Sequence, residues 1–87
     1  MYPDVQLYID GQWRASEAGR TLAVINPATG ETLGTVAHAD IADLDQALAA
    51  AERGFETWRS TPAYDRYKIM QKAADLLRDR VDHIANI

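Results

Sequence analysis

The chain has 87 residues, of which 47% are apolar and 25% are charged, and its formal net charge is −4. This length allows one small domain, and the acidic balance argues against nucleic-acid binding, which needs a concentrated basic surface. The absence of cysteine excludes disulfides, thiolate metal sites and a thiol nucleophile within this polypeptide. The N-terminus lacks the features of a secretory signal, and no apolar run reaches the ~20 residues of a membrane helix. We therefore expect no membrane contact and a cytoplasmic location.

The first expected element is a β-hairpin within residues 7–14. Asp10-Gly11 predicts a two-residue type I′ turn, because both residues can adopt the positive φ that this turn requires. Such a turn places Tyr8 opposite Trp13, and an aromatic cross-strand pair contributes about 0.2–1 kcal/mol. Stacking of a nucleobase on the two rings is the weaker interpretation, because no basic cluster flanks them.

A second hairpin is expected from residues 22–25 and 32–36, joined by the turn 26–31. In this turn Pro27 presets φ near −65°, Asn26 before it is held extended, and Gly30 can take a positive φ. Two isolated hairpins are only marginally stable in water. We therefore expect the helices that follow to cover their apolar faces.

The first helix is expected to begin after Asp40, a good N-cap residue, with Asp43 three positions on. Apolar residues then recur at steps of three and four, which places them on one face of a helix that ends at about Arg59. These residues are Ile41, Leu44, Leu48, Ala51, Phe55 and Trp58. Gly54 within this helix costs about 1 kcal/mol relative to alanine.

A second helix is expected to run to about Arg80, with Thr61 as N-cap and Pro62 in its first position. Its apolar stripe is wide, which predicts more than one partner surface. We expect Asp82 to recap the chain, so that residues 83–87 begin a further helical turn. The chain then stops without a C-cap residue, so we expect it to be cut within an element. The predicted fold class is an α+β fragment, with two β-hairpins in residues 1–39 and two long amphipathic helices in residues 40–87.

Few residues suggest chemistry. His38 and His83 lie far apart and share no metal-ligand spacing. Asp75, Asp79 and Asp82 could suggest a divalent-cation site, but interleaved arginines favour a solvated mixed-charge face. Residues 30–34 lack the lysine and the following helix of a phosphate loop, and no serine or threonine has a nearby histidine and carboxylate in sequence. The residues alone therefore predict no catalytic site.

The order of these features resembles the N-terminus of the NAD(P)-dependent aldehyde dehydrogenase superfamily, and within it bacterial succinate-semialdehyde and related semialdehyde dehydrogenases. The resemblance covers essentially the whole chain and rests on four segments in the expected order and spacing. They are the hairpin 7–13, the turn Ile25-Asn26-Pro27-Ala28-Thr29-Gly30-Glu31, the helix that ends Phe55-Glu56-Thr57-Trp58, and the helix from Arg66 that carries Ala73-Ala74-Asp75-Leu76-Leu77.

The resemblance implies that the chain is the opening part of the cofactor-binding domain of a longer enzyme with an α/β fold. It implies attack on the aldehyde by a cysteine thiolate, hydride transfer to NAD or NADP, and a glutamate-assisted hydrolysis. No catalytic or cofactor-binding residue of this chain corresponds to that machinery, and we expect this chain alone to bind no cofactor. In some members backbone carbonyls before the turn hold a monovalent cation, which corresponds to Val24 and Ile25.

Two hypotheses follow from these patterns. In the first, the chain is an N-terminal fragment of an aldehyde dehydrogenase that is inactive alone, whose partners are the rest of the dehydrogenase chain and further copies in a homo-oligomer. In the second, the chain is a non-enzymatic module that associates with itself or with another protein through an exposed apolar helix face.

Overall fold

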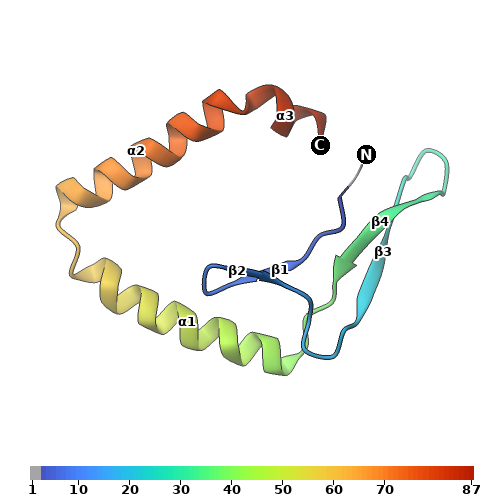
Figure 1. Cartoon of the computed structure of the whole chain (residues 1–87), viewed down its shortest axis with the longest axis horizontal. Helices are drawn as coiled ribbons and strands as arrows, with labels where there is room; N and C mark the ends of the chain where they lie inside the picture. The colour runs from blue at the N-terminus through green and yellow to red at the C-terminus, as the bar shows by residue number, and fades with distance from the viewer. Residues whose placement is uncertain (1–2) are drawn as a thin grey trace. The chain divides into compact units, whose positions relative to one another are not determined.

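The computed structural model describes residues 3–87, which form four short strands followed by three helices (Figure 1). The strands are β1 (Leu7–Ile9), β2 (Gln12–Arg14), β3 (Thr21–Ile25) and β4 (Thr32–Ala37), and the helices are α1 (Ile41–Arg59), α2 (Ala63–Asp79) and α3 (Val81–Asn86). The two antiparallel hairpins β1–β2 and β3–β4 are separate two-stranded sheets. This order confirms the predicted α+β fragment.

The hairpin β1–β2 has the predicted register, with Tyr8 opposite Trp13. Asp10 has a φ of 53° and Gly11 a φ of 75°, as a type I′ turn requires. The rings of Tyr8 and Trp13 lie with their centroids 4.8 Å apart, and both side chains are exposed. The aromatic pair therefore stabilises the hairpin from its outer face, while Ile9 and Arg14 lie on the more protected face.

The hairpin β3–β4 is extended by one residue beyond the prediction at each outer end, and its register shifts between Val24 and Ile25. Val24 pairs with Gly34 and Ile25 pairs with Thr32, so β4 carries one extra residue at this bulge. Val5 forms a parallel bridge to Val36, in which its N–H donates to the Thr35 carbonyl at 2.8 Å. The chain before β1 thus pairs with β4.

The turn between β3 and β4 is closed by its own polar groups. The N–H of Gly30 donates to the Asn26 carbonyl at 2.8 Å, and the N–H of Asn26 donates to the Glu31 carbonyl at 2.8 Å. The side-chain Oδ1 of Asn26 accepts the N–H of Ala28 at 2.9 Å. Gly30 has a φ of 77°, which confirms the predicted positive φ at this position.

The chain divides into two compact units, one up to Arg53 and the other Gly54–Ile87. In the second unit α2 begins one residue later than predicted. Pro62 takes the N-cap position, whereas the Thr61 hydroxyl donates to the Thr57 carbonyl at 2.8 Å. The prediction of Thr61 as N-cap is therefore wrong, because its hydroxyl satisfies the C-terminal end of α1 instead. Nor does Asp82 recap the chain, since α3 begins after Arg80 and has no side-chain cap.

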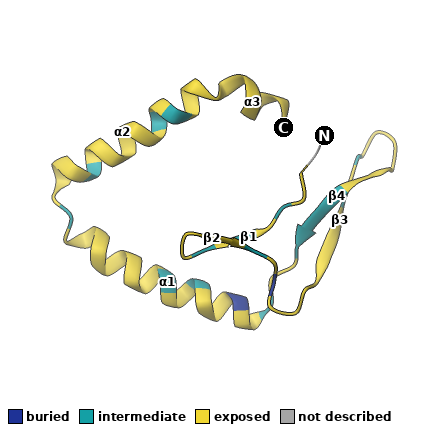
Figure 2. Cartoon of the chain, viewed as in Figure 1, coloured by how far each residue is buried: buried dark blue, intermediate teal, exposed yellow. Residues whose placement is uncertain are grey.

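Among residues 3–87 no apolar side chain is buried, and Figure 2 shows the exposed colour along most of each helix. The expected cover of the hairpins by the helices is found only in part. Leu22, Ile25 and Leu33 of the second hairpin remain between 44% and 52% exposed. The described residues thus have folded elements without a hydrophobic core. No helix among them is both long enough and apolar enough to span a bilayer.

Candidate functional site

The most protected side chain in the described part of the chain is a charged one, Asp43, which is 1% exposed. It lies in the first turn of α1, three residues after Asp40. Its Oδ2 accepts the backbone N–H of Asp40 at 2.8 Å, and the Oδ1 of Asp40 accepts the N–H of Ile41 at 2.9 Å. A residue at the third helical position that bonds back to the N-cap N–H is half of a capping box. The predicted helix start is confirmed, and Asp43 helps to fix it.

Asp43 also binds the end of β2 and the segment that follows it. Its Oδ1 accepts the backbone N–H of Glu17 at 2.9 Å and Nη2 of Arg14 at 2.6 Å. The backbone N–H of Asp40 is the main cause that lowers the pKa of Asp43. Desolvation opposes this effect, and the N–H of Glu17 and the guanidinium of Arg14 add to it. Asp43 is therefore held as a carboxylate.

Arg14 joins three parts of the first unit. Besides Asp43, its Nη1 donates to Oε1 of Gln46 on α1, and its Nη2 lies 3.9 Å from the Glu17 carboxylate. Its Nε is buried and has no hydrogen-bond partner. We call Arg14, Glu17, Asp40, Asp43 and Gln46 the Arg14–Asp43 cluster. A planar guanidinium suits this role, because it presents several donors in a fixed arrangement.

The turn between β2 and β3 is attached to the same region. Ser16 is 5% exposed, its hydroxyl donates to the Arg20 carbonyl at 3.1 Å, and the N–H of Gly19 donates to the Ser16 carbonyl at 3.0 Å. The Arg20 guanidinium lies 3.4 Å from the Asp40 carboxylate. The buried polar groups of this unit therefore serve a turn and a helix start.

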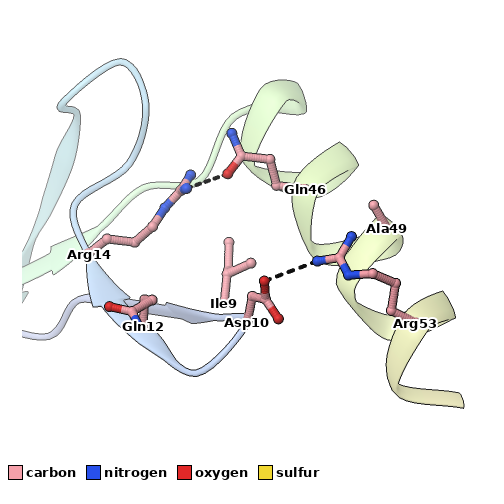
Figure 3. Close-up of a pocket in the computed structure, with 7 residues that line it drawn as sticks. All are labelled: Ile9, Asp10, Gln12, Arg14, Gln46, Ala49 and Arg53. Carbon is pink, nitrogen blue, oxygen red and sulfur yellow. Dashed lines mark hydrogen bonds and ion pairs between the residues drawn. The ribbon is translucent and has the colours of Figure 1, made fainter. Parts of the chain in front are cut away.

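A shallow depression of about 280 Å³ lies between the first hairpin and α1 (Figure 3). Its lining residues are Ile9, Asp10, Gln12, Arg14, Gln46, Ala49 and Arg53. Nη2 of Arg53 contacts Oδ2 of Asp10 at 3.0 Å, and both side chains are mostly exposed. The two arginines of the lining each have a carboxylate partner, and no thiol, serine or histidine lies among the lining residues. The depression therefore has the composition of a packing contact between a hairpin and a helix.

The residues considered in the sequence are not brought together in a metal site. Groups of three or more metal-ligating side chains are absent from residues 3–87. Asp75 contacts Nη1 of Arg78 at 3.1 Å, which agrees with a solvated mixed-charge face. Val24 and Ile25 lie at the bulge of β3–β4. The extra residue of this bulge belongs to β4, so the regular pairing of the two strands is interrupted opposite Val24 and Ile25.

Sequence reasoning placed Asp43 in a helix cap but did not connect it with Arg14. The spacing of Asp40 and Asp43 was the available signal for the cap. Arg14 is the last residue of the short strand β2, and no local pattern marks a contact with a residue 29 positions later. This contact depends on how the hairpin meets α1, which the sequence pattern did not specify.

Comparison with known proteins assigns the chain to a family. Residues 13–87 match the profile of the aldehyde dehydrogenase family. Among solved structures, succinate-semialdehyde dehydrogenase from Burkholderia pseudomallei is 37% identical with a TM-score of 0.86, and the match covers 93% of this chain and 17% of that chain. PnpE from Pseudomonas sp. WBC-3 is 36% identical with a TM-score of 0.89, and the match covers 97% of this chain and 17% of that chain.

A third solved structure is similar as well. The salicylaldehyde dehydrogenase from Pseudomonas putida G7, solved with salicylaldehyde, is 26% identical with a TM-score of 0.88, and the match covers 94% of this chain and 17% of that chain. PnpE has also been solved with nicotinamide adenine dinucleotide. This chain belongs to the aldehyde dehydrogenase family. It spans about a sixth of the length of these solved relatives, so its fold is a fragment of theirs.

Proposed function

We propose that the chain forms the N-terminal part of the cofactor-binding domain of an NAD(P)-dependent aldehyde dehydrogenase and is inactive by itself. The observation that carries this proposal is that the match covers 93% of this chain but 17% of the succinate-semialdehyde dehydrogenase. The thiolate nucleophile that the resemblance implies has to come from other residues, because this chain contains no cysteine. Its own part is structural: Arg14 and Asp43 hold a hairpin against the start of α1.

The proposed substrate class is a semialdehyde. Its support is the 37% identity to a succinate-semialdehyde dehydrogenase, against 26% identity to a salicylaldehyde dehydrogenase. A cytoplasmic location and a homo-oligomeric enzyme complete the proposal. NAD or NADP would be held by residues outside this chain and would accept the hydride there.

The carbonyls of Val24 and Ile25 are proposed as part of a monovalent-cation site. Its support is the bulge at these residues, because carbonyl oxygens are suitable ligands for hard cations and the bulge interrupts the regular pairing of β3 with β4. Two carbonyls do not fill a coordination shell. Further oxygen ligands would come from residues beyond this chain, so a cation is expected to bind only when those residues are present.

Two samples test the main proposal. The first is the 87-residue chain with its mass verified, supplied with NAD or NADP and succinate semialdehyde. The second is a chimaera in which this chain replaces the matched segment of the Burkholderia pseudomallei enzyme. We expect reduction of the cofactor by the chimaera and none by the chain alone. Turnover by the chain alone, or a folded chimaera without turnover, would contradict the proposal.

The second candidate function is an interaction module, which the exposed apolar side chains of α1 and α2 favour. Light scattering and binding of a hydrophobic dye to the isolated chain address it. Formation of a discrete oligomer that buries these side chains would support the module. A compact monomer that binds no dye would count against the module.

A further inference from the structure

One side of the helix α1 contacts the first hairpin, and another side is exposed. Asp43, Gln46 and Arg53 all contact residues of the hairpin or of the turn after it. Figure 3 shows Gln46 and Arg53 reaching from α1 toward Arg14 and Asp10. The side of α1 that meets the hairpin therefore carries these polar contacts, together with Ala49, which also lines the depression.

The apolar residues of α1 within the first unit lie on a different side. Successive residues of an α-helix are rotated by about 100°. By this rule Ile41, Leu44 and Leu48 share one side, roughly opposite the middle of the side formed by Asp43, Gln46 and Arg53. Ile41, Leu44 and Leu48 are 73%, 54% and 60% exposed. We call these three residues the α1 apolar stripe.

The hairpin cannot cover the α1 apolar stripe, because the hairpin already occupies the other side of the helix. An amphipathic helix normally buries its apolar side against another element. The chain spans 17% of the succinate-semialdehyde dehydrogenase that it resembles, so most of the residues that could form such an element lie outside it.

We propose that the α1 apolar stripe is the docking surface for the remainder of the dehydrogenase chain, so that α1 is packed between the first hairpin and that remainder. This inference rests on the proposed function, because it takes the remainder of such an enzyme as the occupant. The Arg14–Asp43 cluster has a distinct part in it. By fixing the hairpin on the polar side of α1, the cluster leaves the apolar side available for the remainder.

The chimaera described above tests the docking surface with a matched pair of variants. Leu48→Gln places an amide in the α1 apolar stripe. Ala42→Gln places the same side chain on the exposed residue after Ile41, rotated by about 100° out of the stripe and outside the lining of the depression. Glutamine is a good helix former, so neither change should break the helix. We expect Leu48→Gln to lower the melting temperature of the chimaera by about 2 °C or more and to reduce its soluble yield, while Ala42→Gln leaves both nearly unchanged.

Equal melting of the two variants would overturn the docking surface. The two proposals fail separately: a chimaera that melts cooperatively but oxidises no aldehyde counts against the proposed function, and the comparison of variants can still be made. An insoluble chimaera would contradict the docking of this surface on the remainder. A discrete dimer of the isolated chain that Leu48→Gln dissociates, together with equal melting of the chimaeric variants, would assign the surface to a second copy and overturn the inference.

Discussion

The turn between β3 and β4 offers a direct test of the backbone argument at Gly30. Its φ is 77°, and a Cβ added there would have no heavy atom within 4 Å. Gly30→Ala is therefore a change in backbone preference without a steric clash. The left-handed conformation costs an L-residue about 1–2 kcal/mol, so closure of this turn should become roughly 5–30 times less favourable.

Amide hydrogen exchange of Asn26 measures this closure, because its N–H donates to the Glu31 carbonyl across the turn at 2.8 Å. We expect Gly30→Ala to speed this exchange by roughly 5–30-fold. Gly30→Asn should have a smaller effect, because asparagine tolerates the left-handed region better than alanine does. Exchange in Gly30→Ala that matches the original chain, or a larger effect of asparagine than of alanine, would refute the reasoning.

Three further predictions concern the helix start, the helix interior and the cation. Because the pKa of Asp43 is lowered in the folded state, its contribution to stability is present above the ordinary carboxyl pKa and is lost as the pH falls through the lowered value. Titration by carboxyl-carbon NMR should show this, whereas a pKa of Asp43 at or above the ordinary value would contradict it. Gly54→Ala should stabilise the helix by up to about 1 kcal/mol, because a Cβ there meets nothing within 4 Å. The helix content measured by circular dichroism should therefore rise, and an unchanged helix content would contradict this prediction. Replacement of sodium and potassium by a bulky organic cation should lower the melting temperature of the chimaera. An equal melting temperature in the alkali salt and in the organic salt would contradict the proposed cation site at Val24 and Ile25.

Local chemistry predicted the elements of this chain well. Asp10-Gly11 specified the type I′ turn and, with it, the pairing of Tyr8 with Trp13. Asp40 marked the start of α1, and the helix ends at Arg59 as expected. These features depend on interactions between residues close in sequence, so a single sequence contains the information that they need.

Contacts between distant residues were harder to predict. The amphipathic pattern of α1 was right. We expected the helices to cover the apolar faces of the hairpins, but the first hairpin contacts polar side chains of α1 through Arg14 and Asp10. Hydrophobic periodicity identifies which side of a helix is buried in a complete fold. It does not tell which partner covers that side, and in this chain the first hairpin is not that partner.

The Arg14–Asp43 cluster also has a consequence for cofactor binding. The N-terminus of a helix attracts the phosphates of a dinucleotide through its free N–H groups and its positive dipole end. At the start of α1 that positive end already has two carboxylates beside it, since Asp40 and Asp43 accept N–H groups there. An incoming phosphate would meet negative charge at this position. In the dehydrogenase that we propose, the phosphates of the dinucleotide are therefore expected to bind away from the start of α1.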